Sequence, residues 1–445
     1  MAVDDSVAVT STPVAINTPL LSVRRAPAVL SRESNSVAFR SELQPLLDSI
    51  DSDSCFTVAI DGEAVAAVNE LTPLRPASNV KLITASVALE VLGEEFVYTT
   101  TVNGVVDTGG VVAGDLFLIG GGDPLLSSAW WDGPNQKFPP VNVTSIEALA
   151  DAVKAAGVTA IDGSIVGDAT RYDGEWYLPT WAPALRFSEG GPLSALLVND
   201  SREAADLSSN DPVVGAATVL TQLLQERGVT IGGPPKEGTS DGSPVIAKVD
   251  SQPLPAVLKE MLTTSDNNTA ELVLKEIGLA TGGAGTTALG LQKVMSTLGE
   301  WGIPLDGVTV VDGSGLSDEN RLTCQALLAV VEHGSVDDAV GRGLPLGGEK
   351  GGTLYDAFQE GEPLSGVLRA KTGTLDNTDG VADKLGAKAL SGYVPLPGGG
   401  AIEFALLLNG ETITNKTEYR PTWELLASLL AAYPTGPTPD ALAPR

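Results

Sequence analysis

Histidine is almost missing from this chain, which has one, His333, among its 445 residues. His333 ends the segment LLAVVEHGS, whose apolar periodicity predicts a helix. A histidine at the end of a helix stabilises the negative end of the helix dipole, and this structural role is favoured over a catalytic one. A single histidine argues against a His-rich metal site and against a Ser-His-Asp triad. A serine hydrolase of this composition would need a different base.

Cysteine is nearly as rare, with Cys55 and Cys324 as the two examples. Two cysteines cannot build a four-cysteine zinc site, and these two form no CxxC motif. We therefore expect no metal site and no cofactor. The sequence leaves two alternatives open for the pair, which are a single disulfide in an oxidising compartment and two buried free thiols.

Long apolar runs are also missing, because no stretch of 18 or more apolar residues occurs. Residues 1–24 lack the basic start and apolar run of an intact secretion signal, and one interpretation is that they are the remainder of an export region. Positive charge is scarce, with a formal net charge of −29. Such a chain would repel phosphate backbones, so we expect no nucleic-acid partner.

Apolar runs and turn residues alternate as in a mixed α/β protein. Two strands are predicted at 55–60 and 61–70, ahead of a long helix at 74–93 whose start Ser78 and Asn79 would cap with their side chains. Near the C-terminus, VLRAKTGT, ALSGYVP and AIEFALLLNG predict three consecutive strands before a last helix. This order predicts an α/β (α+β) fold, in which helices flank an antiparallel sheet that the early strands join.

The strand-rich middle of the chain predicts an insertion into that core. We expect residues 25–97 and 201–445 to form the core domain and residues 98–200 to form the inserted domain. Residues 1–24 remain as a separate N-terminal segment.

Three short motifs carry chemistry, and the first is SxxK at Ser78–Lys81. The i, i+3 spacing at a helix start places both side chains on one face, so the lysine amine can reach the serine hydroxyl. Lysine acts as a base only when neutral. Burial and a second nearby cation such as Lys371 would lower its pKa.

The other two motifs are SDN at residues 265–267 and KTGT at residues 371–374. Ser265 can relay a proton to a leaving amine, and Asn267 can bind a substrate amide. On a predicted strand, Gly373 would leave room for a ligand backbone, and the side chains beside it suit a carboxylate. Each motif alone is an ordinary helix cap, turn or strand end, whereas all three in this order indicate a serine acyl-transfer enzyme.

With these motifs the chain resembles the class C low-molecular-mass penicillin-binding proteins, a family of D-Ala-D-Ala carboxypeptidases and endopeptidases. The resemblance extends over residues 40–430. It implies a penicillin-binding/β-lactamase-like core. Four further segments resemble family signatures: LFLIGGGDPLL (116–126), GSIVGDAT (163–170), SDNNTAELVLKEIG (265–278) and DGSGLS (312–317).

The resemblance implies a role for each motif residue. Ser78 would attack the carbonyl between two D-alanines, and Lys81 would take its proton. Ser265, with Lys81, would protonate the departing D-alanine. The substrate-binding residues would be Asn267 on the amide and, on the terminal carboxylate, Lys371, Thr372 and Thr374, with Gly373 between them. The N–H groups of Ser78 and Thr374 would form the oxyanion hole.

The partners that the resemblance implies are peptidoglycan stem peptides and, as covalent inhibitors, β-lactam antibiotics. It also implies an exported protein of the cell envelope, in the periplasmic space or on the outer face of the cytoplasmic membrane. The sequence does not specify the oligomeric state or the balance between carboxypeptidase and endopeptidase activity.

The chain departs from the family pattern at two places. Residues 198–212 join the flanking signatures directly, so a third nested domain found in many relatives is expected to be absent. Asp318 follows DGSGLS where many relatives have a basic residue, and Arg321 is one candidate to replace that residue.

Three rival functions stay open on the sequence. A β-lactamase needs an activating glutamate, but no ExxLN-like segment lies between SDN and KTGT. An esterase could use the same scaffold. The third rival is a non-catalytic wall-binding protein, against which the complete set of motif residues argues.

Overall fold

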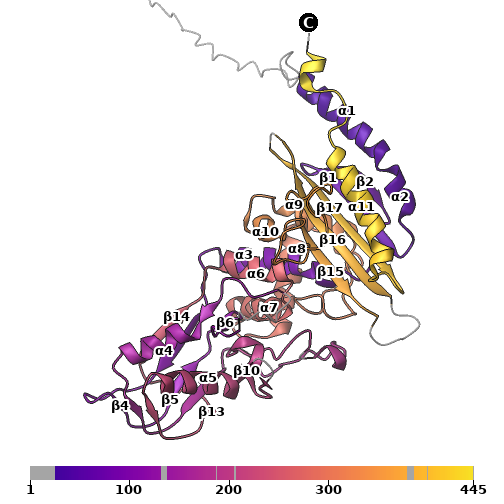
Figure 1. Cartoon of the computed structure of the whole chain (residues 1–445). Helices are drawn as coiled ribbons and strands as arrows, with labels where there is room; N and C mark the ends of the chain where they lie inside the picture. The colour runs from indigo at the N-terminus through magenta and orange to yellow at the C-terminus, as the bar shows by residue number, and fades with distance from the viewer. Residues whose placement is uncertain are drawn as a thin grey trace, which may run out of the picture.

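The computed structural model divides the chain into a larger lobe that contains the core sheet and a smaller lobe below it (Figure 1). The predicted N-terminal segment 1–24 lies outside the described residues, which are 26–131, 138–186, 188–204, 207–377, 385–397 and 399–443. Among these residues no helix is both long enough and apolar enough to cross a membrane.

The core sheet has five strands, and every neighbouring pair is antiparallel. The three predicted C-terminal strands are adjacent, and the two early strands extend the same sheet, which confirms the expected fold class. The order across the sheet is β15 (Arg369–Leu375), β16 (Gly386–Pro395), β17 (Ala401–Gly410), β1 (Ser54–Ile60) and β2 (Glu63–Val68).

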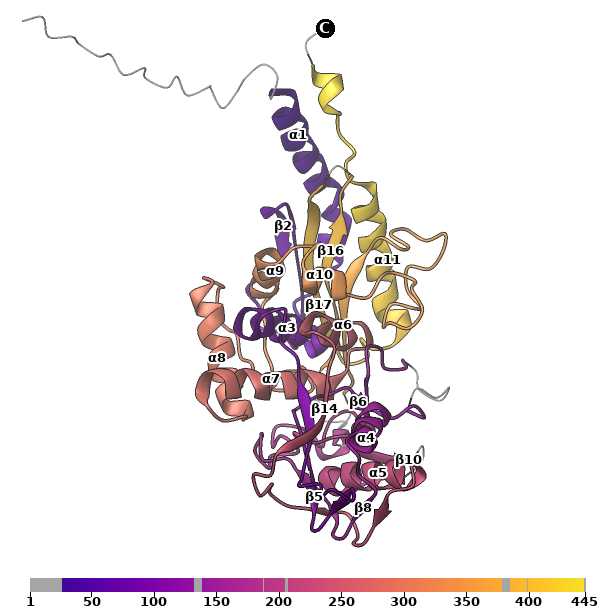
Figure 2. The same cartoon turned by 90° about the vertical axis from the view of Figure 1, so that its left-hand side faces the viewer.

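Helices cover both faces of this sheet. Successive side chains of a strand point to opposite faces, and in β1 both faces carry apolar side chains. In β1, Phe56 and Val58 pack into the apolar cluster beneath α11 (Lys416–Ala432), while Cys55 and Ala59 pack into the cluster on the other face. Helices α1 (Ala26–Glu42) and α2 (Gln44–Ser49) share the α11 face. In both views α1 lies beside the C-terminal end of the chain (Figures 1 and 2).

The second face packs against a group of helices that lies between the sheet and the smaller lobe (Figure 2). At its centre is α3 (Val80–Leu92), which is buried on nearly every side and carries Lys81. Around α3 lie α6 (Leu254–Thr264), α7 (Asn267–Gly282), α8 (Thr287–Glu300), α9 (Cys324–His333) and α10 (Ala339–Gly343).

The smaller lobe is built on a second five-stranded sheet, which packs against α4 (Ile146–Ala155) and α5 (Pro212–Glu226). Its strand order is β13 (Lys236–Glu237), β9 (Ile165–Asp168), β5 (Leu116–Ile119), β3 (Thr99–Asn103) and β14 (Val245–Asp250). Short strands add to this lobe: β4 (Val111–Val112), β8 (Ala160–Ile161) and β12 (Thr230–Ile231) in one sheet, β6 (Leu126–Ser127) with β7 (Thr144–Ser145), and β10 (Arg202–Ala204) with β11 (Leu207–Ser208).

The expected domain boundary at residue 200 falls inside this lobe. Strand β14 pairs with β3, and β13 pairs with β9, so residues after 200 complete the second sheet. Short strands of two or three residues give little sequence periodicity, which is why the segment 230–250 looked like part of the core. We propose to place the boundary after Asp250, with residues 98–250 as the inserted domain.

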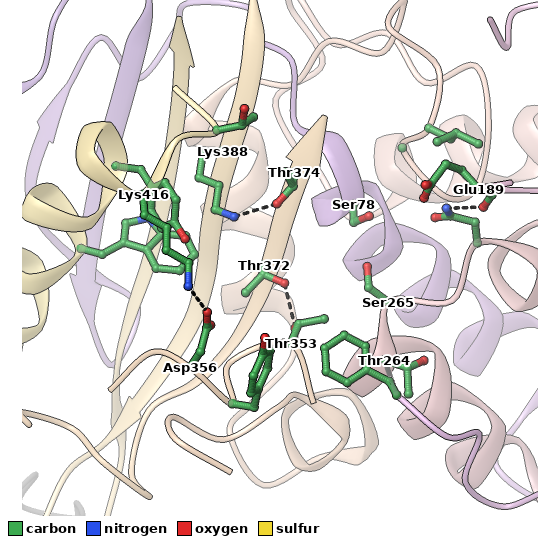
Figure 3. A pocket seen from close by; sticks show the side chains of 18 residues that line it. Ser78, Glu189, Thr264, Ser265, Thr353, Asp356, Thr372, Thr374, Lys388 and Lys416 are labelled. Carbon is green, nitrogen blue, oxygen red and sulfur yellow. Dashed lines mark hydrogen bonds and ion pairs between the residues drawn. The ribbon is translucent and has the colours of Figure 1, made fainter. Parts of the chain in front are cut away.

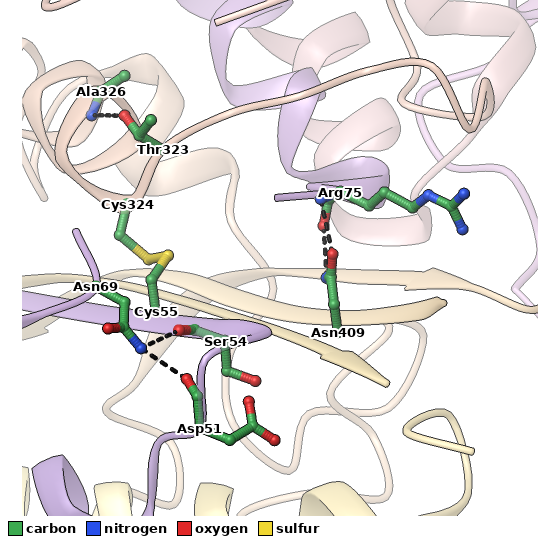
Figure 4. The surroundings of a disulfide bond; sticks show 9 residues. All are labelled: Asp51, Ser54, Cys55, Asn69, Arg75, Thr323, Cys324, Ala326 and Asn409. Carbon is green, nitrogen blue, oxygen red and sulfur yellow. Dashed lines mark hydrogen bonds between the residues drawn. A yellow bond between two sulfur atoms is a disulfide. The ribbon is translucent and has the colours of Figure 1, made fainter. Parts of the chain in front are cut away.

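The two cysteines form a disulfide, which decides between the two alternatives that the sequence left open (Figure 4). Cys55 belongs to β1 and Cys324 is the first residue of α9, and both side chains are fully buried. Their Cα atoms lie 6.0 Å apart, although 269 positions separate them in the sequence. The bond therefore joins the first strand of the sheet to a helix on its second face.

We expect the disulfide to resist reductant in the native protein, because both sulfurs are shielded from solvent. Alkylation and mass measurement should find no free thiol under native conditions and two after denaturation. Replacing both cysteines by alanine should lower the free energy of unfolding by about 2–4 kcal/mol, since the bond closes a long loop. Equal denaturant midpoints for the variant and the oxidised wild type would contradict this expectation.

Candidate active site

Ser78 lies in a single 3-10 turn, Ala77–Asn79, that leads directly into α3. The backbone of Ala77 has a positive φ of 46°, which an L-residue rarely adopts, so the turn must be held by its surroundings. Gly315 packs against this turn and helps to keep Ala77 in that conformation. The φ of Gly315 is +83°, and a Cβ atom there would lie 1.9 Å from the carbonyl oxygen of Ala77. The turn that carries Ser78 therefore packs on a backbone with no side chain.

The predicted side-chain caps of this helix are not formed, because the N-terminal position, Asn79, makes no capping hydrogen bond. Instead, the Asn79 side-chain amide donates to the carbonyl oxygen of Lys371 at 3.4 Å. The side chain thus links the Ser78 turn to strand β15, which carries the KTGT motif.

Lys81 is fully buried, and its ammonium nitrogen contacts three oxygen atoms. Nζ lies 3.0 Å from Ser78 Oγ, 2.6 Å from Asn267 Oδ1 and 2.8 Å from the carbonyl oxygen of Ser314. Burial lowers the pKa of Lys81 to about 8, against the opposing pull of nearby carboxylates, of which Asp266 is the strongest. A substantial fraction of Lys81 is therefore a neutral amine near neutral and mildly alkaline pH.

The loop 312–317 contacts Lys81 through the carbonyl oxygen of Ser314. Glu271 of α7 accepts hydrogen bonds from the backbone N–H groups of Gly313 and Ser314. Asp312 accepts from Gly315 N–H at 2.8 Å and from Trp181 Nε1 at 3.1 Å. These bonds fix the Ser314 carbonyl that contacts Lys81.

Glu271 is fully buried, and burial together with Asp312 raises its pKa to about 8. The periodicity of α7 signals its position, because Glu271 follows Asn267 by four residues and so shares its face of the helix. No role was predicted for Glu271 or Asp312, although both lie in segments that resemble family signatures. The signal that would have found Glu271 is an acidic residue four positions after Asn267, on the same face of the predicted helix.

Ser265 and Asn267 lie on either side of the junction between α6 and α7. Ser265 ends α6 in the left-handed conformation, with φ 69° and ψ 32°. Asp266 caps α7 by accepting from Thr269 N–H at 2.5 Å. This cap turns the chain sharply, so that Ser265 reaches Lys371 while Asn267 reaches Lys81.

Lys371 is the second buried lysine of the site, and its Nζ lies 2.8 Å from Ser265 Oγ. Burial, with the neighbouring charges of Lys81 and Lys388, holds the pKa of Lys371 well below its ordinary value. The resemblance paired Ser265 with Lys81. In the structure the hydrogen bond of Ser265 is to Lys371.

Gly373 has no room for a side chain, because the Ser78 turn packs closely against strand β15 at this position. A Cβ atom there would lie 2.8 Å from the carbonyl oxygen of Pro76, just before the Ser78 turn, and 3.0 Å from the Asn79 side-chain nitrogen. The predicted reason for this glycine was room for a ligand backbone. The structure gives a different reason, which is the close approach of the Ser78 turn to strand β15.

The motif residues surround one pocket with a volume of about 440 Å³ (Figure 3). Ser78, Ser265 and Asn267 line it together with Thr372 and Thr374. Lys81 and Lys371 lie beneath them, fully buried. The remaining lining residues include Phe138, Glu189, Thr353, Tyr355, Asp356, Lys388, Lys416, Tyr419 and Trp423.

Arg321, the candidate for the basic residue expected after DGSGLS, contacts backbone carbonyls in this structure. Its Nη1 donates to the carbonyl oxygens of Asp318 and Asn320, and it is not among the lining residues of the pocket. The Oδ2 atom of Asp318 lies 3.8 Å from Nη2 of Arg75. The only histidine, His333, is the last residue of α9 and stacks on the Trp301 ring at 3.8 Å, in agreement with a structural role.

The comparisons with known proteins agree with one another. The model of the D-Ala-D-Ala carboxypeptidase 3 (S13) family matches residues 47–211 and 195–431. Carboxypeptidase DacB of Mycolicibacterium smegmatis is 31% identical, over 78% of this chain and 73% of that protein. The chain belongs to the D-Ala-D-Ala carboxypeptidase 3 (S13) family. It is a serine-type D-Ala-D-Ala carboxypeptidase, as its sequence motifs indicate.

The similarity to a solved structure and to a second relative extends over most of the chain. Penicillin binding protein 4 (dacB) from Haemophilus influenzae has the same fold, with a TM-score of 0.69 at 21% identity, covering 87% of this chain and 98% of that one. The D-alanyl-D-alanine carboxypeptidase of Actinomadura sp. (strain R39) is 29% identical over 493 aligned positions, covering 89% of this carboxypeptidase and 86% of that enzyme.

The alignment with the Actinomadura enzyme is longer than this chain's 445 residues, so that enzyme contains segments that this carboxypeptidase lacks. The two matches to the family model meet at residues 195–211, within the segment that was predicted to join the flanking signatures directly. The absence of a third nested domain stays a prediction.

Replacing Gly315 by alanine should slow acylation of this carboxypeptidase by penicillin on the order of a hundredfold, because the added Cβ would displace the Ser78 turn. The rate of labelling by fluorescent penicillin measures the effect. Gly302→Ala is the matched control, since Gly302 also has a positive φ but no atom within 4 Å of an added Cβ. Equal labelling rates for the two variants would contradict the packing role of Gly315.

The pH dependence of kcat/KM should rise through a pKa of about 8, because only neutral Lys81 can accept a proton. Asp266→Asn should move this limb to lower pH, because asparagine keeps the helix cap while the strongest charge that raises the pKa of Lys81 is removed. Initial rates over a range of pH measure both curves. If the rise of kcat/KM occurs at the same pH in the variant as in wild type, the titrating group is not Lys81.

Proposed function

We propose that Ser78 is the nucleophile with which this carboxypeptidase removes D-alanine from peptidoglycan stem peptides. The observation that carries the proposal is the 3.0 Å contact between Ser78 Oγ and Lys81 Nζ at the floor of the pocket. The amine lies within hydrogen-bond reach of the hydroxyl, and burial keeps part of it neutral.

Acylation begins when Ser78 Oγ attacks the carbonyl carbon between the two D-alanines. Lys81 takes the hydroxyl proton as the new C–O bond forms. The negative charge on the carbonyl oxygen is stabilised by the backbone N–H groups of Ser78 and Thr374. The N-terminus of α3, next to Ser78, adds a favourable positive potential.

Ser265 delivers the proton that the departing D-alanine needs. Its oxygen accepts a hydrogen bond from Lys371, so its own hydroxyl proton can go to the leaving nitrogen as the C–N bond breaks. Ser265 then recovers a proton through the lysines, so the proton lost by Ser78 is balanced by the one gained by D-alanine. In deacylation water attacks the ester, and its proton passes through Lys81 back to Ser78.

The substrate is held on both sides of the scissile bond. Asn267 binds the amide on the acyl side with its side chain, next to Lys81. Lys371, Thr372 and Thr374 bind the terminal carboxylate. Thr372 and Thr374 are two positions apart, so their hydroxyls lie on the same face of β15.

The same chemistry makes β-lactams covalent inhibitors of this enzyme, since their ring presents an amide and a carboxylate to the same groups. One solved relative is a Haemophilus influenzae penicillin binding protein 4 complexed with a novel beta-lactam, which supports the proposal. A cell-wall substrate places the enzyme outside the cytoplasm, in the periplasmic space or on the outer face of the membrane.

The intact mass after incubation with penicillin tests the nucleophile. Wild type should gain one penicillin, located to the peptide that contains Ser78, and Ser78→Ala should gain none. Ser296→Ala, which changes an exposed serine of α8, should label like wild type. An adduct on Ser78→Ala would contradict the assignment.

Substrate assays separate the remaining rivals. Rapid turnover of nitrocefin would indicate a β-lactamase, and cleavage of short acyl esters without D-alanine release would indicate an esterase. A cross-linked peptide dimer assayed beside a monomeric pentapeptide measures the endopeptidase activity that the family resemblance implies.

A further inference from the structure

The pocket contains another lysine, Lys388, that belongs to none of the three motifs. It lies on β16, directly opposite Thr374 of the KTGT strand in the register of the sheet. Its ammonium nitrogen donates to the hydroxyl oxygen of Thr374 at 2.8 Å (Figure 3). Lys388 also lines the same pocket as Ser78 and Ser265.

Two aromatic rings of α11 orient the Lys388 side chain. Its Nζ lies 4.3 Å from the centre of the Tyr419 ring and 5.3 Å from that of Trp423. Both aromatic side chains are almost fully buried, and their rings pack against each other 4.8 Å apart. An ammonium held against such faces is stabilised by the ring quadrupoles, so the cation is placed next to Thr374 before any ligand arrives.

Two lysines contact the KTGT strand in this part of the pocket: Lys371 Nζ donates to the backbone carbonyl of Thr372, and Lys388 Nζ donates to the hydroxyl of Thr374. Lys371 approaches from beneath, where it contacts Ser265, and Lys388 approaches across the sheet from β16. Lys388 is close enough to Lys371 for its charge to disfavour protonation of Lys371. A carboxylate placed at the hydroxyl of Thr374 would therefore meet the positive charge of Lys388, and its own negative charge would favour protonation of Lys371.

We propose that Lys388 is a specificity-determining residue, which binds the terminal carboxylate of the substrate together with Thr374. The carboxylate anchor of this enzyme would then contain two lysines, one from the KTGT motif and one from the neighbouring strand. This inference rests on the proposed function, because it assigns the position of the substrate carboxylate.

Lys416 provides the comparison within the same pocket. Its ammonium lies 2.6 Å from a carboxylate oxygen of Asp356, and its side chain is 66% exposed. Arg420 also contacts that carboxylate, at 3.1 Å. Lys416 thus has the same formal charge as Lys388, but its ammonium pairs with Asp356, and we assign it no part in carboxylate binding.

A pair of thioester substrates tests the inference. Both have the same N-acyl-D-alanyl group, and the leaving thiol carries a carboxylate in one and a carboxamide in the other. Thioesters are reactive enough for the neutral member to be measured. Released thiol is followed with a thiol reagent, and the quantity compared is the ratio of kcat/KM for the acid to that for the amide.

Lys388→Met keeps most of the side-chain volume and removes the charge. We expect its kcat/KM for the acid to fall by about tenfold to a hundredfold, the effect of losing a charge-assisted hydrogen bond. The value for the carboxamide should change by less than about threefold. Lys388→Arg should restore most of the preference, and Lys416→Met should leave the ratio near that of wild type.

The other outcomes contradict the inference. An equal loss on both thioesters would show that Lys388 supports the pocket rather than the carboxylate. The same selective loss in Lys416→Met would show that the total charge of the pocket matters and not this contact. A wild type that cleaves neither thioester would contradict the proposed function, and the inference with it.

Discussion

The site depends on the burial of one lysine amine, that of Lys81, between three chain segments. Taking a lysine side chain out of water disfavours its charged form, which is what the general base that we propose at this position requires. The cost is reduced because Nζ contacts Ser78, Asn267 and the Ser314 carbonyl. Each of these oxygens comes from a different part of the chain. The geometry of the base therefore depends on how α3, α7 and the loop 312–317 pack together.

Acidic side chains near Lys81 oppose the lowering of its pKa by burial. Asp266 and Glu271 both favour the charged form of Lys81, against the larger effect of burial. Hydrogen bonds to the backbone fix the positions of both side chains. Asp266 caps α7, and Glu271 accepts from the backbone of the loop that contacts Lys81. The same carboxylates thus hold the base in place and keep its pKa from falling further.

Much of this arrangement follows from local sequence, and the rest does not, for identifiable reasons. The three C-terminal strands and the Ser78 helix have clear periodicity, and the motif spacing placed Lys81 beside Ser78 correctly. Lys388 carries no local signal, because its proximity to Thr374 arises from strand register. The boundary that we propose after Asp250 lies about 50 residues beyond the one expected from the sequence, since strands such as β12 and β13 have only two residues and give little periodicity. The Cys55–Cys324 disulfide could not be predicted from the sequence either, because the fold brings together two cysteines that lie 269 positions apart.

The inserted domain supplies no motif residue, but it contacts α7, the helix that begins at Asn267. Lys275 of α7 is fully buried and pairs with Asp173 at 2.5 Å, and the next residue, Glu276, pairs with Arg171 at 2.5 Å. At the start of the same helix, Asn267 donates to the Glu189 carbonyl at 2.6 Å. Since α7 begins at Asn267 and carries Glu271, contacts with the inserted domain fix the helix that positions Lys81. The two domains therefore act as one unit around the base.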